Sequence, residues 1–435
     1  MKLFFILFSS LTLCIFSMQS YAATPELQQI TNNLDMAWLM TTGALVFFMQ
    51  AGFALLESGM CRAKNTVNVI MKNYVDAGVG SIAFWFIGFG LMFGNNFTGW
   101  FGEGHWLLNT AQPHEFSFLF FQMMFATTCV TIASGAMAER TRYSGYLVGA
   151  FFICLVIYPV YGSWAWGSFY EGKGWLAQLG FIDFAGSSVV HSAGGWIALA
   201  GIMVLGPRMG RFSETGKTRT ISGHNLTLVA LGGFILWLGW FGFNGGSTTR
   251  AVPEIGLIIL NTHMAASTGM VGSMLTMYLL RSPILMTETV NGSIAGLVGI
   301  TAGCATMDPV FAAITGLIAG SIAVLGGRFL IRLRFDDVVG AVSVHAFAGV
   351  WGTLAAGMFF HGDLFDITKI VIQLVGIAAC FLWVFPLAYV MYWVINKTIG
   401  LRVSTIDEQR GLDYTEHFEI GYPEFQHVIL NPGKD

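Results

Sequence analysis

The segment Asp183-Phe-Ala-Gly-Ser-Ser-Val-Val-His191 has a second copy in the chain, Asp337-Val-Val-Gly-Ala-Val-Ser-Val-His345. In each copy the aspartate stands eight residues before the histidine, and extending both copies to Gly195 and Gly349 gives five identities in thirteen positions. Eight residues of helix rise about 12 Å. If each aspartate lies at a membrane surface, its histidine lies near the middle of the hydrocarbon, where an ionisable side chain is costly and usually functional.

The composition of the whole chain supports a membrane setting. Its 21 basic and 24 acidic residues make up only 10% of 435, whereas 55% of the residues are hydrophobic and the mean hydropathy is +0.66. A soluble globular protein carries roughly 25% charged residues. These values exclude disordered, collagen-like and nucleic-acid-binding classes, and they predict an all-α polytopic membrane protein in a lipid bilayer.

Long apolar segments separated by short polar breaks predict eleven transmembrane helices. Their approximate ranges are 36–58, 74–95, 116–137, 143–165, 185–206, 224–246, 255–280, 285–306, 309–328, 339–360 and 367–396.

The basic residues indicate the orientation of these spans. Seventeen lie in one set of loops and in the C-terminal segment, while the opposite loops hold three, namely Lys173, Arg250 and Lys369. Under the positive-inside rule, the mature N-terminus is periplasmic and the C-terminus is cytoplasmic. Five spans separate the two Asp–His copies, so the copies run in opposite directions. This predicts an inverted five-plus-five repeat with a transport site between the halves near mid-bilayer.

The chain divides into three predicted parts. Residues 1–23 resemble a secretory signal peptide, with Lys2, an apolar stretch and a cleavage site after Ala22 or Ala23. The alternative is an uncleaved first transmembrane helix. Residues 24–396 form the transmembrane domain and 397–435 a cytoplasmic tail. The signal favours the inner membrane of a bacterium.

The sequence offers little for cofactor or enzyme chemistry. Six cysteines have no paired spacing, and they predict neither a metal site nor a disulfide framework: Cys14, Cys61, Cys129, Cys154, Cys304 and Cys380. The chain contains no nucleotide-binding loop of the form G-x-x-x-x-G-K-[ST]. We expect no cofactor and no enzymatic activity.

The two histidines and Asp183 each have a structural and a functional interpretation. A lone buried histidine is as often a packing residue as a functional one, but two in symmetric positions favour function. Imidazole titrates near neutrality, so a pair could share and relay a proton. Asp183 is interpreted as a structural acid that caps its helix.

Five motifs together identify the chain as similar to the ammonium transporter (Amt/Rh) family, on the Amt branch. They cover about residues 30 to 425 and are Arg62-Ala-Lys-Asn65, Gly135-Ala-Met-Ala-Glu-Arg140, Asp183 to His191, Gly239-Trp-Phe-Gly-Phe-Asn-Gly-Gly-Ser247, and Gly400-Leu-Arg-Val403 with Gly411-Leu-Asp413. The resemblance implies a homotrimer with a separate narrow pore through each eleven-helix subunit, used for nitrogen uptake.

The resemblance also implies roles for individual residues. The family's outer cation site falls on Phe125, Trp166 and Ser247, with Trp164 as the alternative tryptophan. The phenylalanine gate falls on Phe125 and Phe243. The family's other positions fall on residues already described: the pore histidines on His191 and His345, and the buried acid on Asp183.

The tail resembles the family segment that touches neighbouring subunits and lies near the docking site of PII signalling proteins. Three departures from the family pattern, at Phe418, Ala346 and Gly340, put PII regulation and the inner-pore geometry in question. Two other functions stay open: an ammonium sensor that signals through its tail, and a gas channel.

Overall fold

The computed structural model describes residues 25–108, 112–167, 169–215 and 217–425. The predicted signal segment therefore lies outside the described residues, as does the end of the tail. Helices account for nearly all of the regular structure, and no strand forms within the described ranges, where only isolated bridges occur. The all-α membrane fold is thus confirmed.

The first half of the bundle contains several helices interrupted by π-helical turns, which are named η here. Its elements are α2 (Pro25–Met60), α3 (Thr66–Val75), η2 (Asp76–Gly80), α4 (Ser81–Ala83), η3 (Phe84–Gly88), α5 (Phe89–Phe93), α6 (Pro113–Ala136), α7 (Tyr143–Phe152), η5 (Ile153–Ile157), α8 (Tyr158–Trp166), α9 (Trp175–Leu179), η6 (Ser187–Ser192) and α10 (Ala193–Leu205).

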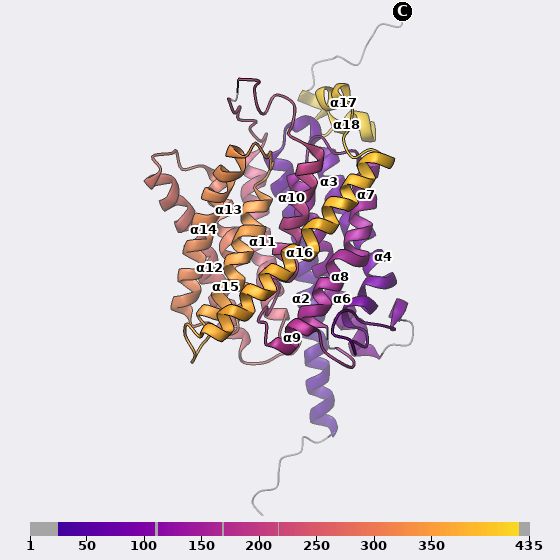
Figure 1. Ribbon diagram of the computed structural model, residues 1–435, viewed down its shortest axis with the longest axis vertical. Helices are drawn as coiled ribbons and strands as arrows, with labels where there is room; N and C mark the ends of the chain where they lie inside the picture. The colour runs from indigo at the N-terminus through magenta and orange to yellow at the C-terminus, as the bar shows by residue number, and fades with distance from the viewer. Residues whose placement is uncertain (1–24, 109–111, 168, 216, 426–435) are drawn as a thin grey trace, which may run out of the picture.

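The second half continues the bundle and ends in two short helices. Its elements are α11 (Leu226–Gly246), α12 (Ile255–Leu279), α13 (Met286–Ile300), α14 (Pro309–Arg332), η7 (Val342–Phe347), α15 (Ala348–Met358), α16 (Ile367–Thr398), α17 (Thr405–Arg410) and α18 (Leu412–His417). Figure 1 shows α17 and α18 together at one end of the bundle, called the tail end below, and α9 at the opposite end.

Each of the eleven predicted ranges contains a helix, but not all of these helices are long. Nine helices in the described part of the chain are long and apolar enough to cross a membrane. The other two ranges hold α13, with 15 residues, and the apolar helix Val342–Met358. The membrane protein is confirmed as multi-pass, while the number of eleven spans stays a prediction.

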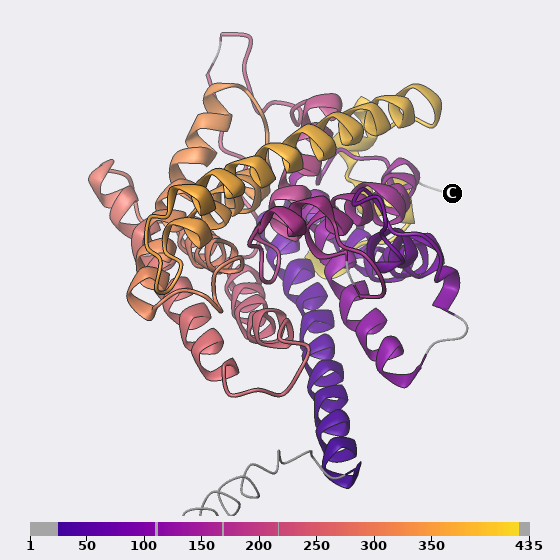
Figure 2. The same cartoon turned by 60° about the horizontal axis from the view of Figure 1, so that its bottom comes forward.

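The helix α16 is the longest in the second half and lies obliquely across the bundle in both views (Figures 1 and 2). Its 32 residues span about 48 Å, well beyond a hydrocarbon core of about 30 Å. Tilting is the usual way for such a helix to fit a membrane. Pro386 lies inside it without ending it.

Small residues let neighbouring helices approach closely. A Cβ atom added to Gly320 of α14 would overlap the carbonyl oxygen of Gly269 in α12. Lipid gives little hydrophobic force between helices, so membrane bundles rely on such close packing.

The two Asp–His copies form matching structures that run in opposite directions. Asp336, which precedes η7, binds Arg208, which follows the end of α10. At the other end of the pair, Ser188 of η6 hydrogen bonds to Thr353 of α15. The start of each copy therefore lies beside the end of the other, as an inverted repeat requires.

Candidate functional site

The two histidines meet in the interior of the bundle. Nδ1 of His191 in η6 lies 3.3 Å from Nδ1 of His345 in η7, and the ring centroids are 5.3 Å apart with a 21° interplanar angle. The side chains are 0% and 4% exposed. For this contact to be a hydrogen bond, one Nδ1 must carry a proton and the other must accept it. The pair can therefore hold one shared proton between the two halves of the molecule.

Aromatic rings surround the histidine pair. The ring of His191 stacks on Trp240 of α11 at 4.8 Å and lies 5.4 Å from Phe243, whereas His345 lies 6.3 Å from Phe53 of α2. Nε2 of His191 is buried and has no hydrogen-bond partner among the described residues. Because buried polar atoms are nearly always paired, this nitrogen is a ready contact for a small passing molecule.

A stacked phenylalanine pair adjoins His191 on the side away from the tail end. Phe125 of α6 and Phe243 of α11 have ring centroids 4.0 Å apart with a 24° interplanar angle. Both rings are buried, at 1% and 0% exposure. Ring atoms at this separation leave no room for a water molecule between the two rings.

The two candidate tryptophans differ in their contacts. The Trp166 ring contacts Phe125 edge to face at 6.2 Å, and its Nε1 donates to the carbonyl of Asp183. The Trp164 ring packs instead against Trp100 and other aromatic residues and is buried. Trp166 is therefore the tryptophan that adjoins the phenylalanine pair.

Ser247 ends the same helix that carries Phe243. Its hydroxyl donates to the carbonyl of Phe243 at 2.9 Å, one turn back along α11. The hydroxyl oxygen retains its acceptor capacity. This places a polar acceptor one helical turn beyond the phenylalanine pair.

Asp183 and Asp337 cap the π-helical turns that carry the histidines. The carboxylate of Asp183 accepts from the backbone N–H groups of Gly186, Ser188 and Val189 at 2.8–3.0 Å. Burial raises the pKa of Asp183 to about 6, although these N–H groups act to lower it. Gly186 has φ +114°, a left-handed conformation that glycine adopts without strain.

The second cap repeats this geometry. The carboxylate of Asp337 accepts from the N–H groups of Gly340, Ala341 and Val342 at 2.7–3.0 Å, and Gly340 has φ +83°. The aspartates thus fix where each turn begins, and so how far each histidine reaches into the bundle.

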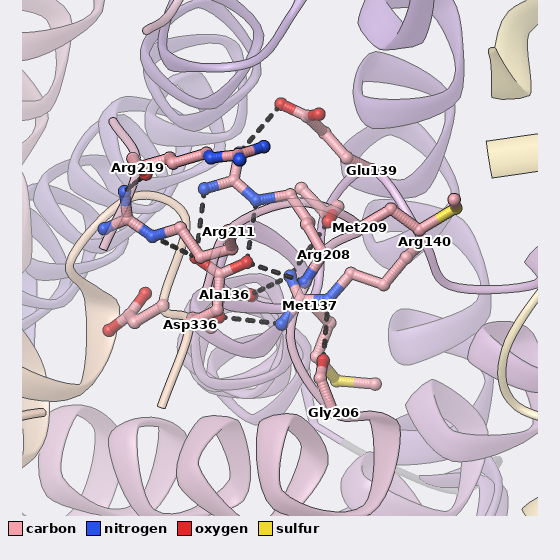
Figure 3. A network of polar contacts seen from close by, with 12 residues as sticks. Ala136, Met137, Glu139, Arg140, Gly206, Arg208, Met209, Arg211, Arg219 and Asp336 are labelled. Atoms are coloured by element: carbon pink, nitrogen blue, oxygen red, sulfur yellow. Dashed lines mark hydrogen bonds and ion pairs between the residues drawn. The ribbon is translucent and has the colours of Figure 1, made fainter. Parts of the chain in front are cut away.

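An ion network ties together four chain segments at the tail end, and Figure 3 labels residues from three of them. Asp336 accepts from the backbone N–H, Nε and Nη2 of Arg208 at 2.8–3.0 Å, and Arg211 forms a further ion pair with it at 3.2 Å. Glu139 binds the other side of Arg208, and its second oxygen pairs with Arg62.

The surroundings of Asp336 favour its charged form. Burial acts to raise the pKa of Asp336, but hydrogen bonds and the charge of Arg208 outweigh it and hold the pKa well below its usual value. Arg140 crosses the same region and donates to the carbonyls of Gly206 and Asp336. Because Asp336 precedes the cap Asp337, the network anchors the turn that carries His345.

The tail folds back onto the same end of its own subunit. Glu408 of α17 accepts from Arg402 at 2.7 Å and from the backbone N–H of Met209 at 2.7 Å. Asp413 of α18 accepts from the backbone N–H of Asn68 at 2.9 Å. The described part of the tail, up to residue 425, is thus docked on the bundle.

Two internal spaces lie between the histidines and the tail end. A small cavity of about 20 Å³ is lined by His345, Glu57, Asn291 and Val339, among others. A larger space of about 390 Å³ also includes Asn291 and Val339 and reaches Arg328. The shared residues make the two spaces neighbours along one path.

The structure brings most of the predicted site residues into one row. Phe125, Phe243, His191 and His345 follow one another, and Trp166 adjoins the first of them. Ser247 and Asp183 lie beside this row through the contacts given above.

Sequence reasoning did not single out Trp240, Phe53 or Glu57. Trp240 stands three residues before Phe243, a spacing that puts both side chains on one face of a helix and could have revealed it. Phe53 carries no such signal, because its apolar surroundings resemble those of any packed helix. Glu57 does carry one, since it is an acidic residue inside the predicted span 36–58, where an ionisable side chain is usually functional.

Three comparisons relate the chain to known proteins. The sequence profile of the Ammonium Transporter Family matches residues 37–422. "Ammonium transporter Amt2" of Archaeoglobus fulgidus is 42% identical over 421 residues, covering 90% of this chain and 89% of that protein. A solved structure named "Sensor Amt Protein" superimposes with a TM-score of 0.87 at 39% identity, covering 90% of this chain and 100% of that one. Candida albicans Mep2 gives a TM-score of 0.78 at 27% identity, covering 86% and 87% of the two chains.

Proposed function

The chain belongs to the Ammonium Transporter Family, and we propose that it takes up ammonium by separating the ion into ammonia and a proton inside each subunit. It is a multi-pass membrane transporter, and its substrate is ammonium. The observation that carries the mechanism is the row formed by the phenylalanine pair and the two touching imidazoles.

The outer site is proposed to be Phe125, Trp166 and Ser247. Ammonium is small and strongly hydrated, so its transfer into a low dielectric costs many kcal/mol. Aromatic faces return about 0.5–2 kcal/mol each by cation–π attraction, and a hydroxyl oxygen can accept a hydrogen bond from the ion. These groups concentrate the ion at the entrance but do not compensate for its complete dehydration.

The gate is proposed to be Phe125 and Phe243. Rings 4.0 Å apart exclude water, so side-chain movement must open the path for each passage. The neutral species beyond such a gate is much cheaper to bury than the cation. We therefore propose that ammonium loses its proton at or just behind this pair.

His191 and His345 are proposed to line the pore and to relay the released proton. Each neutral imidazole offers one donor and one acceptor nitrogen, so the pair can bind ammonia and hold a proton. Potassium has no proton to lose and should be rejected. Asp183 is proposed to act only as the structural acid that sets the depth of His191.

The experiment is an electrical recording on proteoliposomes with an imposed ammonium gradient. The wild-type protein should give an ammonium-dependent current or internal pH change, and this should fall sharply in His191→Asp. Unchanged flux and selectivity in that variant would refute the relay. Competition by methylammonium should be effective, whereas a gas channel would be insensitive to it.

The cellular setting is part of the proposal. We propose a homotrimer in the inner membrane of a bacterium, with the N-terminus periplasmic after signal cleavage and the tail end cytoplasmic. Exposed apolar side chains such as Phe47 and Leu382 suit contact with lipid or with a neighbouring subunit. A PII signalling protein is the proposed partner for the cytoplasmic face.

One observation favours a second function, that of an ammonium sensor. The structure named "Sensor Amt Protein" matches over its full length, and the tail of the present chain is docked where it could report a change. Deleting residues 401–435 separates the two functions. A transporter should keep its uptake, whereas a sensor should lose its effect on nitrogen signalling without a matching loss of flux.

A further inference from the structure

The small cavity between the histidine pair and the tail end is lined by one further group that can exchange a proton. Glu57, near the end of α2, lines the same cavity as His345. The other residues given as its lining are Asn291 and side chains that cannot exchange a proton, such as Phe53, Leu56 and Val339. With a volume of about 20 Å³ the cavity has room for one water molecule.

The carboxylate of Glu57 is held in place by hydrogen bonds to one of its oxygens, Oε2. Its Oε2 accepts from Asn73 Nδ2 at 2.9 Å and from Ser134 Oγ at 2.7 Å. The side chain is only 1% exposed. Burying a carboxylate in the membrane is costly, and this cost argues for a function beyond packing.

The charged groups around Glu57 come from the helices packed against it. Lys72 of α3 is the neighbouring cation, and its Nζ is buried without a hydrogen-bond partner in the described part of the chain. Asp76 of η2 is a nearby acid, but its carboxylate is bound by the hydroxyls of Tyr146 and Thr131. Neither Lys72 nor Asp76 lines the cavity below His345.

We propose that Glu57 accepts the proton on the cytoplasmic side of the histidine pair, through one water molecule in this cavity. The inference rests on the proposed proton relay. The N–H bond of the His345 imidazolium breaks, the water takes this proton, and it gives one of its own to the carboxylate. His345 becomes neutral, Glu57 becomes a carboxylic acid, and the water is regenerated.

The proton then has a short way out. The cavity shares Asn291 and Val339 with the larger space at the tail end, whose lining includes Glu288, Arg328 and Asp337. Release through this space returns Glu57 to its charged form for the next cycle. One proton thus crosses for each ammonia, and transport moves charge.

The test compares charge and ammonium movement in the same proteoliposomes. Ammonium entry is assayed chemically while the current is recorded. In Glu57→Gln the charge carried per ammonium should fall by roughly a hundredfold, the lower end of what a positioned proton-transfer group contributes. Glu254→Gln makes the same change at an exposed acid and should keep the wild-type ratio. If Glu57→Gln carries the same charge per ammonium as the wild type, the inference is overturned.

Two more variants separate proton transfer from a structural role. If Glu57 only neutralises Lys72, then the double variant Glu57→Gln, Lys72→Met should regain the wild-type ratio, and that result would overturn the inference. Glu57→Asp keeps the negative charge but withdraws it by one methylene, so we expect a reduced current with a larger solvent isotope effect. This variant decides the question even if the glutamine variant does not fold.

The same recording distinguishes this inference from the proposed function. A wild-type protein that moves no ammonium would refute transport, and the inference with it. A wild-type protein with an ammonium current, whose ratio of charge to ammonium is unaffected at position 57, would refute the role of Glu57 alone.

Discussion

Replacing Asp336 by asparagine should destabilise the folded protein by about 3–5 kcal/mol, because it leaves the buried Arg208 without its main counter-ion. The carboxylate accepts three hydrogen bonds from Arg208 and pairs with Arg211. An asparagine offers one oxygen, and its amide group would face guanidinium donors. The loss of about two charge-assisted bonds, at about 1.5–3 kcal/mol each, gives about 3–6 kcal/mol, which overlaps this range.

The measurement is the free energy of unfolding, obtained by titrating a denaturing detergent into the purified protein. Asp363→Asn is the matched control, since Asp363 pairs with Lys369 on the surface, where such pairs contribute little. A loss below about 1 kcal/mol in Asp336→Asn would show that the network does not anchor the tail end.

The pH dependence of this difference follows from the sign of the pKa shift. The pKa of Asp336 is lowered in the folded protein, whereas an unfolded aspartate titrates near about 3.9. Its stabilising contribution is therefore fully present above that value and is lost as the pH falls through the folded pKa. The gap between wild type and Asp336→Asn should be constant from about pH 5 to 8 and shrink only in stronger acid.

Three further substitutions test the outer site, the gate and the packing. Trp166→Ala should raise the ammonium concentration for half-maximal current by roughly 2- to 30-fold, the equivalent of one cation–π contact, whereas Trp164→Ala should mainly lower thermal stability. Phe243→Ala should let water reach His191, so protons should leak through the protein in the absence of ammonium, as measured with a pH-sensitive dye. If this variant shows no proton leak, the proposed gate is contradicted. Gly320→Ala should lower the free energy of unfolding by about 1–3 kcal/mol, because its added methyl group meets the backbone of Gly269.

The repeated motif made the centre of the site predictable. The equal spacing of Asp183 to His191 and of Asp337 to His345 indicates how deep the two imidazole rings lie. Together with the number of spans between them, it also indicates that the two copies run in opposite directions. Hydropathy located a helix in each of the eleven predicted ranges, because a spanning segment needs a long apolar run. It did not give the lengths of the shorter helices: α13 ends at Ile300, in a stretch where turns continue to 306.

The parts of the fold and the site that the sequence did not predict depend on contacts between residues far apart in the chain. Arg208 and Asp336 are 128 positions apart, and neither lies in a motif that indicates its partner. Glu57 and His345 line the same cavity only because α2 and η7 both border it. Sequence periodicity shows which face of a helix is apolar, but it does not show which helix covers that face.

The central claim is that two touching imidazoles take a proton from the cargo and so exclude ions that have none to give. The most direct measurement is the ratio of potassium current to ammonium current, recorded across the same membranes for the wild type and for His191→Asp. The wild type should pass ammonium and no measurable potassium. The variant should pass potassium, because a carboxylate beside Phe243 would hold a hydrated cation. If the ratio of potassium current to ammonium current is equally low in both proteins, and the ammonium current of the variant is intact, the account is contradicted.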